Sequence, residues 1–241
     1  MIAGFEFGAR APLFVRRECV VVEAAPPTTW RLIYASDLHL TARREHVGAA
    51  LVEAVAENSC DAVLLGGDLL EQRSGVGLLE QTVQRLAAHA PVFAVAGNHD
   101  GWLGKGLARA AVRAGGGHWL HEAEVELVQA GARLQLHAAL RPRSAADAAS
   151  VRVLVGHDPK LALAAAPHYD LVLAGHLHGG QCVWWQRGAQ LYPGAWFSRW
   201  NGLRYRVGNA VLLVSRGVAD TVPVRFRCPR EVLACEVGGR P

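Results

Sequence analysis

Short apolar runs that end in a small residue and then in Asp, His or Asn recur along this sequence. The runs occupy residues 32–36, 62–67, 92–97, 151–156 and 172–175. The polar residues after them are Asp37 and His39, then Asp68, then Asn98, His99 and Asp100, then His157 and Asp158, and finally His176 and His178. Short apolar runs of this kind predict buried strands. Because open α/β sheets bind ligands beyond the carboxyl ends of their strands, these polar side chains are expected to meet.

Helical periodicity separates the first three of these strands. The apolar positions are Val47, Leu51, Ala54 and Val55 in a helix over Glu45 to Asn58, and Leu78, Leu79, Val83 and Leu86 in a second helix. A third helix is predicted over Leu103 to Ala114, and a strand over Arg17 to Glu23 precedes them all, ended by Pro26 and Pro27. Alternating strands and helices predict parallel strands with right-handed connections.

The pattern changes after Gly117. The runs Val125 to Val128 and Leu134 to Leu136 predict a hairpin. Residues Arg141 to Ser150 form a polar, Ala-rich loop, and a short helix is expected after Pro159. Residues Val183 to Val237 are rich in β-forming residues and lack a helical period, so we expect antiparallel strands that form a second sheet. No linker divides the chain, and we expect one domain over residues 1–241 with an irregular leader at 1–17.

Composition narrows the classes of protein that fit this pattern. Hydrophobic residues make up 51% of the 241 residues and charged residues 19%, which allows a sizeable core and excludes wholesale disorder. The formal net charge of +4 suits an anionic substrate. The basic residues are scattered, however, and no basic run with interleaved aromatic residues favours nucleic-acid binding.

Cysteine usage and hydropathy bear on the compartment. The five cysteines are odd in number and widely spaced, which favours buried thiols in a reducing compartment over disulfides. No segment reaches the roughly 18 uninterrupted apolar residues of a membrane span. Charged residues from Glu6 to Arg17 also interrupt any signal-peptide core. We therefore expect a cytoplasmic protein without a transmembrane segment, while peripheral membrane contact and the oligomeric state stay open.

The residues at the strand ends form a donor set for metal ions. Carboxylate, amide and imidazole donors without thiolates suit Mn, Fe or Zn more than Ca, and seven donors exceed what a four-ligand site needs. Two ions roughly 3.5 to 4 Å apart can share one carboxylate and lower the pKa of a shared water to near neutrality. The set therefore indicates a dinuclear centre, most simply with Mn, that hydrolyses a phosphate ester. The predicted donors are Asp37, His39, Asp68, Asn98, His157, His176 and His178.

The five clusters, SDLH, GGD, GNHD, GHD and GHLH in that order, resemble the signature of the calcineurin-like metallophosphoesterases. The resemblance implies an α/β fold, a four-layer αββα sandwich of two mixed β-sheets flanked by helices. It also implies two ligand sets that share Asp68, with the metal-bound hydroxide as the attacking group. The first ion would be held by Asp37, His39, Asp68 and His178, and the second by Asp68, Asn98, His157 and His176.

The same resemblance assigns catalytic roles to two further residues. His99 matches a family histidine that faces the phosphate and protonates or steadies the leaving oxygen, and Asp100 matches the acid that holds its imidazole. The closing stretch GHLHGGQ is similar to a small bacterial branch of phosphodiesterases that usually read GHTHGGQ, so Leu177 departs from the pattern. By this analogy we expect a metal-dependent hydrolase of small phosphodiesters.

Other functions stay open beside this one. A phosphomonoesterase or a pyrophosphatase of the UDP-2,3-diacylglucosamine type would use the same motifs. A non-catalytic scaffold on the same fold is disfavoured because every ligand position keeps a competent residue, and a repair-type nuclease would usually add a capping domain. Taken alone, each cluster could also be structural, as when Asp37 caps a helix and His39 fills a core.

An aromatic-rich region follows the closing motif. Packing in the core or between the sheets is the favoured interpretation, and a wall for an apolar or sugar-bearing leaving group is the alternative. The residues of this region are Trp184, Trp185, Trp196, Phe197 and Trp200.

Overall fold

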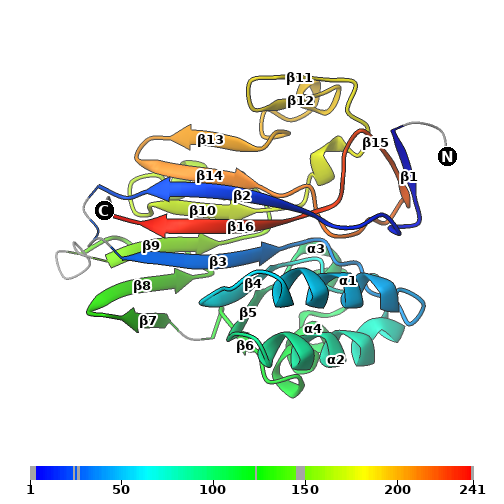
Figure 1. Cartoon of the computed structure of the whole chain (residues 1–241), viewed down its shortest axis with the longest axis horizontal. Helices are drawn as coiled ribbons and strands as arrows, with labels where there is room; N and C mark the ends of the chain where they lie inside the picture. The colour runs from blue at the N-terminus through cyan, green and yellow to red at the C-terminus, as the bar shows by residue number, and fades with distance from the viewer. Residues whose placement is uncertain (1–3, 24, 26–27, 123, 145–149, 240–241) are drawn as a thin grey trace.

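The computed structural model describes residues 4–23, 25, 28–122, 124–144 and 150–239, and its framework is two large mixed sheets. The first sheet has the strand order β2 (Phe14–Val21), β16 (Glu231–Gly238), β3 (Thr29–Ala35), β4 (Ala62–Gly66), β5 (Val92–Val95) and β6 (His118–Trp119). The second has the order β13 (Arg204–Val207), β14 (Ala210–Val214), β10 (Leu171–Ala174), β9 (Ser150–Val155), β8 (Ala132–His137) and β7 (Val125–Gln129). Figure 1 shows β16 running between β2 and β3.

Helices connect the strands of the first sheet and cover its outer face (Figure 1). They are α1 (Glu45–Ala56), α2 (Val76–Ala87), α3 (Asn98–Leu103) and α4 (Lys105–Ala114), with a 3-10 turn η1 (Arg73–Gly75) before α2. The second sheet carries α5 (Leu161–Ala165), and the 3-10 turns η3 (His178–Gly180) and η4 (Gly194–Trp196) follow β10. Two small sheets complete the described chain, β1 (Phe5–Phe7) with β15 (Val224–Phe226) and β11 (Trp185–Arg187) with β12 (Gln190–Tyr192).

Alternation along the strands builds three apolar layers. Ile33 and Leu65 face the helices of the first sheet, whereas their neighbours Leu32 and Leu64 join the cluster between the sheets. In the second sheet the inner residues belong to that same cluster, and the outer ones, such as Val172, pack under α5 and Trp200. The predicted α/β fold with two mixed sheets flanked by helices is therefore confirmed.

Most predicted elements appear within a few residues of their expected ends, and the third helix is the main exception. The sequence predicts one helix over residues 103–114, but α3 ends at Leu103 and α4 begins at Lys105. Gly104 between them has φ of +99°, a left-handed backbone that glycine adopts without a Cβ clash. The missed helix α3 begins directly at Asn98, within the GNHD cluster. The short strand β6 was also not predicted.

The expectation that residues 183–237 form the second sheet is wrong. Only β13 and β14 of residues 183–237 belong to it, while β16 lies in the first sheet, parallel to β2 and antiparallel to β3. The centre of the second sheet is instead the parallel set β9, β10 and β14. These strands are buried on both faces, and β10 and β14 are continuous apolar runs without alternation, whereas β9 also contains the buried Ser150 and Arg152. The predicted hairpin of β7 and β8 is confirmed and extends this sheet.

The leader over residues 1–17 is not irregular throughout. Phe5–Phe7 form β1, which pairs antiparallel with β15, and β2 begins at Phe14 rather than at Arg17. Residues Arg141 to Ser144 are irregular, as predicted for this loop, and Ser150 opens β9; positions 145–149 of the loop lie outside the described residues, as do Pro26 and Pro27. Within the described chain, every helix is too short or too polar to cross a bilayer.

Cysteines and aromatic residues divide between core and surface. The five cysteines are free; Cys228 and Cys235 are buried, and Cys19 is exposed. Of the aromatic-rich region, Trp200 is buried in the outer core of the second sheet, so the packing interpretation holds for it. The interpretation is wrong for Trp184, Trp185, Trp196 and Phe197, which are exposed.

Candidate metal centre

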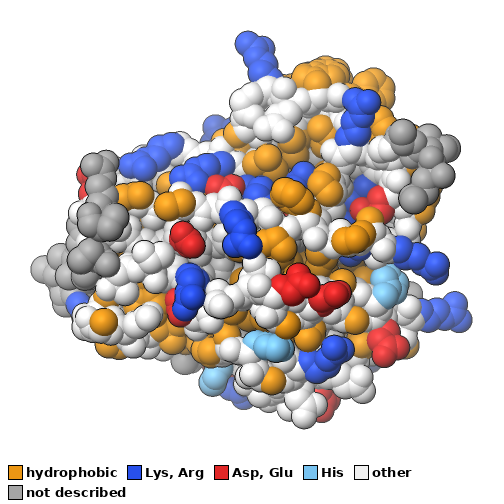
Figure 2. Space-filling view, in the orientation of Figure 1, with side chains coloured by type: hydrophobic (Ala, Val, Ile, Leu, Met, Phe, Trp, Pro, Cys, Tyr) orange, Lys and Arg blue, Asp and Glu red, His pale blue; other side chains and the backbone are white. Residues whose placement is uncertain are grey.

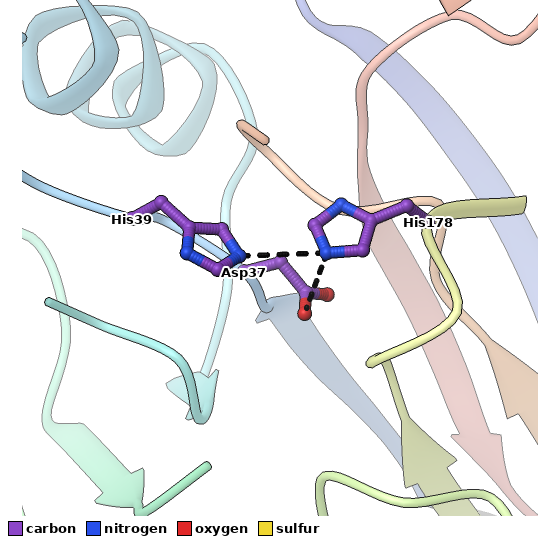
Figure 3. A group of neighbouring side chains, drawn as sticks. All are labelled: Asp37, His39 and His178. Atoms are coloured by element: carbon purple, nitrogen blue, oxygen red, sulfur yellow. Dashed lines mark hydrogen bonds and ion pairs between the residues drawn. The ribbon is translucent and has the colours of Figure 1, made fainter. Parts of the chain in front are cut away.

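The polar residues predicted to meet do so at one end of the two sheets. Asp37 and His39 follow β3, Asp68 follows β4, Asn98 follows β5, His157 follows β9, and His176 and His178 follow β10. Figure 3 shows Asp37, His39 and His178 pointing toward one another from different segments. His39 Nε2 lies 3.4 Å from His178 Nε2, and His178 Nε2 lies 3.5 Å from Asp37 Oδ1. Both sheets therefore contribute donors to this first group.

A second group of donors lies beside the first. His157 Nε2 is 3.0 Å from Asn98 Oδ1 and 3.2 Å from His176 Nδ1. The same His157 nitrogen is 3.2 Å from Asp68 Oδ2. A cavity of 280 Å³ opens at this group and is lined by Asn98, His157 and His176 among others.

Asp68 connects the two groups. Its Oδ2 atom is 3.2 Å from His157 Nε2 in the second group and 4.0 Å from His39 Nε2 in the first. Its other oxygen, Oδ1, accepts a hydrogen bond of 2.8 Å from the backbone N–H of His99. One carboxylate thus faces both sets of imidazoles, so all seven predicted donors are brought together.

The donor chemistry fits divalent cations. Asp37, His39 and His178 can each offer one ligand atom within 4.8 Å of the others, and so can Asp68, His157 and His176. These groups are built from imidazole nitrogens and carboxylate oxygens, which suit Mn, Fe or Zn. The structure also shows a third such group, formed by His39, Glu71 and His99.

Glu71 is a site residue that the sequence analysis missed. Its Oε2 atom lies 2.7 Å from His39 Nδ1 and 3.3 Å from His99 Nδ1. Hydrogen bonding to His39 lowers the pKa of Glu71, so the carboxylate stays charged and fixes the His39 proton on Nδ1, leaving Nε2 free to face the centre. Backbone pairing between the segments after β3 and β4 places Glu71 beside His39, since the Glu71 N–H donates to Leu40 C=O. Extending that register in the sequence would have identified Glu71.

The role predicted for Asp100 is wrong in its geometry. The Asp100 carboxylate is fully buried and accepts hydrogen bonds from the backbone N–H groups of Leu69, Leu70 and Gly97. As the third residue of α3, it turns back over the helix start instead of reaching the His99 ring. The carboxylate that lies within ion-pair distance of the His99 ring is that of Glu71.

Asp220 is a second carboxylate that the sequence analysis missed, and it orients His178 in the first group. Asp220 Oδ1 lies 2.9 Å from His178 Nδ1, which turns Nε2 of that ring toward Asp37 and His39. The buried Arg225 donates from Nε and Nη2 to both Asp220 oxygens at 2.7 Å. Burial opposes the charge of Asp220, but hydrogen bonds from His178 and Arg225 outweigh it and lower its pKa to about 2. A separation of 42 residues hides this pair from sequence patterns.

Left-handed backbone is concentrated at the site. Nine described residues other than glycine have positive φ, and five of them are predicted ligands. Such conformations cost about 1–3 kcal/mol each for non-glycine residues and persist only where surrounding contacts impose them. The five are Asp37, His39, Asp68, His176 and His178.

Two glycines allow the carboxylates to approach the backbone. A Cβ on Gly97 would stand 2.1 Å from Asp68 Oδ1, and one on Gly175 would stand 2.5 Å from Asp37 Oδ2. Any larger residue would push these carboxylates away from the histidines. The small residue at the end of these two apolar runs is therefore a steric requirement of the site.

Known proteins are similar to this chain over most of its length. Residues 31–215 match the model of the calcineurin-like phosphoesterase superfamily domain. Phosphodiesterase YaeI of Escherichia coli (strain K12) is 27% identical in a match that covers 89% of this chain and 83% of that protein. An uncharacterized metallophosphoesterase of Aquifex aeolicus (strain VF5) is 26% identical over 95% of this chain and 93% of its own length. Among solved structures, TT1561 of Thermus thermophilus is similar with a TM-score of 0.48 and 12% identity, over 79% of this chain and 91% of that one.

Cation-free protein should lose stability as the pH rises. Burial lowers the pKa of His157, but hydrogen bonding to Asp68 and the charge of Asp37 outweigh burial and raise it from 6.5 to about 9. The protonated ring therefore stabilises the fold fully below pH 6.5, and this contribution is lost as pH passes 9. Denaturant unfolding of chelator-treated protein should show a decrease on the order of 2–3 kcal/mol over that range. His157→Gln should remove the decrease and the exposed control His89→Gln should keep it; an equal decrease in both variants would contradict this assignment.

Removing the Asp220 carboxylate should weaken cation binding. Loss of such an outer partner of a ligating histidine typically lowers metal affinity about 10- to 100-fold. We expect this loss in Asp220→Asn, measured by calorimetric titration with Mn²⁺. Asp170→Asn is the matched control, because Asp170 also pairs with an arginine, Arg143, away from the centre. Equal affinities of the two variants would show that Asp220 does not position His178.

Proposed function

This chain belongs to the calcineurin-like phosphoesterase superfamily and is a phosphoric ester hydrolase, and we propose that it cleaves phosphodiesters with two divalent cations. The observation that carries the proposal is the place of Asp68 between two groups of imidazoles. A carboxylate in that position is what a pair of cations roughly 3.5 to 4 Å apart requires as a bridge. In this proposal residues 1–241 act as a single domain.

The seven donors divide into two ligand sets around that carboxylate. The proposed sets are Asp37, His39, Asp68 and His178 for one cation, and Asp68, Asn98, His157 and His176 for the other. When bound, the two cations would neutralise phosphate oxygens and lower the pKa of a water that attacks phosphorus. The Nδ1–H groups of His39 and His178 donate hydrogen bonds to Glu71 and Asp220, respectively, and these bonds hold the two imidazoles ready for this binding.

His99 is the proposed general acid. Its ring lies edge-on to that of His39, with centroids 4.7 Å apart, and it does not belong to the two proposed ligand sets. A hydrogen bond from the His99 Nδ1–H group to Glu71 would orient the ring. The protonated Nε2 atom would then transfer its proton to the departing alcohol oxygen. The exposed Trp102 ring, 4.6 Å from the His99 ring, lies on the solvent side of this group.

A phosphodiester is the substrate class that one relative favours. The chain matches YaeI, which is named a phosphodiesterase, over most of its length. A phosphomonoester or a nucleotide-linked pyrophosphate would meet the same donors, so substrate comparison must separate them. We further propose manganese as the physiological ion and the cytoplasm as the compartment; the free state of all five cysteines supports a reducing compartment.

A substrate comparison on one metal-quantified sample tests the proposed reaction. Mn-reconstituted protein should turn over bis-nitrophenyl phosphate with a higher kcat/KM than nitrophenyl phosphate, a cyclic nucleotide or a UDP-sugar lipid. Asp68→Asn should abolish turnover with its circular dichroism spectrum unchanged, because the shared charge is removed. Full turnover by a verified Asp68→Asn protein would rule out the bridging role, and a higher kcat/KM for the monoester or the pyrophosphate would replace the diester assignment.

His99→Ala separates acid catalysis from cation binding. Loss of a general acid typically lowers the rate about 10²- to 10⁴-fold. We expect that loss in kcat with a leaving group of high pKa and a smaller loss with nitrophenolate, which needs little protonation. Bound Mn should be unchanged, and His89→Ala should behave as wild type. An equal decrease for both leaving groups, or a matching loss of Mn, would contradict the role of His99.

A further inference from the structure

Four aromatic side chains that follow the metal centre in sequence stand largely in solvent. We call Trp184, Trp185, Trp196 and Phe197 the aromatic patch; they are 64%, 43%, 66% and 89% exposed. Large apolar groups gathered on a surface mark a site of interaction more often than chance exposure does. Side chains this exposed project outward and do not line a groove.

The patch is held on a compact support. Trp184 and Trp185 lie at the start of the β11–β12 hairpin, and Trp196 closes the turn η4 that follows it. The Trp185 ring stacks on Tyr192 at 5.2 Å with an angle of 6°, and Trp196 meets Trp185 edge-on at 5.4 Å. Figure 1 shows the hairpin at the end of the molecule away from α1–α4, and in Figure 2 hydrophobic side chains gather there beside Lys or Arg.

Buried hydrogen bonds attach this support to the metal centre. Asn201, which is buried, donates from Nδ2 to Leu191 C=O at 2.8 Å and to Gly179 C=O at 3.3 Å. Leu191 belongs to β12, and Gly179 follows His178 in the turn η3. The position of the patch is therefore fixed relative to the histidines of the centre.

Charge around the patch is positive. Residues 171–219 contain five arginines and neither Asp nor Glu. Four of these arginines, Arg187, Arg199, Arg204 and Arg206, are exposed. Arg187 lies between Trp185 and Trp196 in the sequence, and Arg199 follows Phe197 by two residues. Arg187 and Arg199 form no ion pair with a carboxylate in the described part of the chain, whereas Arg204 pairs with Glu18. The guanidinium of Arg199 lies 4.4 Å from the centre of the Trp200 ring.

We propose that the aromatic patch docks this protein on the surface of an anionic lipid bilayer. Tryptophan is enriched where hydrocarbon meets headgroups, because its ring is apolar and its N–H seeks a polar partner. Arginines beside inserted aromatic rings would lie among the headgroups and favour anionic lipids. Docking would hold the metal centre close to the bilayer, and it does not depend on which ester the centre hydrolyses.

Vesicle cosedimentation tests the docking with variants that change only exposed side chains. The full chain should bind phosphatidylcholine vesicles that contain phosphatidylglycerol and bind pure phosphatidylcholine more weakly. Arg187→Gln with Arg199→Gln should weaken binding to the anionic vesicles about 25-fold, since each arginine contributes about fivefold. The triple variant Trp184→Ser, Trp196→Ser, Phe197→Ser should lose binding to both kinds of vesicle. Val128→Ser with Leu163→Ser is the matched control, because these side chains are also exposed but lie on β7 and α5.

A second measurement keeps the test independent of the triple variant's folding. Brominated phosphatidylcholine in the anionic vesicles should quench tryptophan fluorescence of the unchanged chain, and Trp184→Phe with Trp196→Phe should remove most of the quenched signal. Three outcomes would overturn the proposal: no vesicle binding by the unchanged chain, equal binding by the triple variant and the control, or quenching that persists in the double variant. A dimer in sedimentation that only the triple variant abolishes, without vesicle binding, would identify a second copy as the occupant.

Discussion

Two carboxylates that are almost completely removed from solvent, Asp37 and Asp68, impose the central constraint on this structure. A buried carboxylate stays charged only where donors or cations surround it. Asp37 receives the Ser36 hydroxyl at 2.6 Å and the backbone N–H of His176 at 3.1 Å. Asp68 has the His99 N–H on one oxygen and imidazoles of both groups near the other. Burial opposes the charge of Asp68, yet the hydrogen bond with His157 and its neighbours lowers the pKa to about 2. Two sheets must bring their strand ends together to satisfy these two side chains.

Much of this arrangement could be predicted because short, contiguous stretches of sequence determine it. The apolar runs before Asp37, Asp68 and His157 identified buried strands, and the rule that ligands lie beyond strand ends then placed the donors together. Strand pairing was less accessible. β16 reads as one more β-forming stretch, and nothing within it shows that it inserts between β2 and β3. That choice depends on which edge is open once the other strands have packed.

The missing parts of the site share a different cause. Glu71 and Asp220 hold ring nitrogens on the side away from the centre, so they need not stand in any strand-end motif. Arg225 lies one contact further out and is fully buried against Asp220. Asp100 was misassigned because the family resemblance equates it with the acid that holds the imidazole, while in this helix the third residue turns away from the second. Residues that hold the ligands from outside the centre can be identified only once the three-dimensional course of the backbone is known.

The central position of β16 has a consequence for how the protein is made. β16 bonds to β2 on one side and to β3 on the other. At its start, the Glu231 N–H donates to Gly217 C=O, and the segment after Gly217 in turn donates to the backbone of Ser36 and Asp37. A ribosome that has not yet released residue 238 therefore carries a nascent chain in which β3 has an unpaired edge and Asp37 lacks part of its support. Such open strand edges are where incomplete chains pair wrongly. Chaperone protection during translation would matter most until β16 emerges.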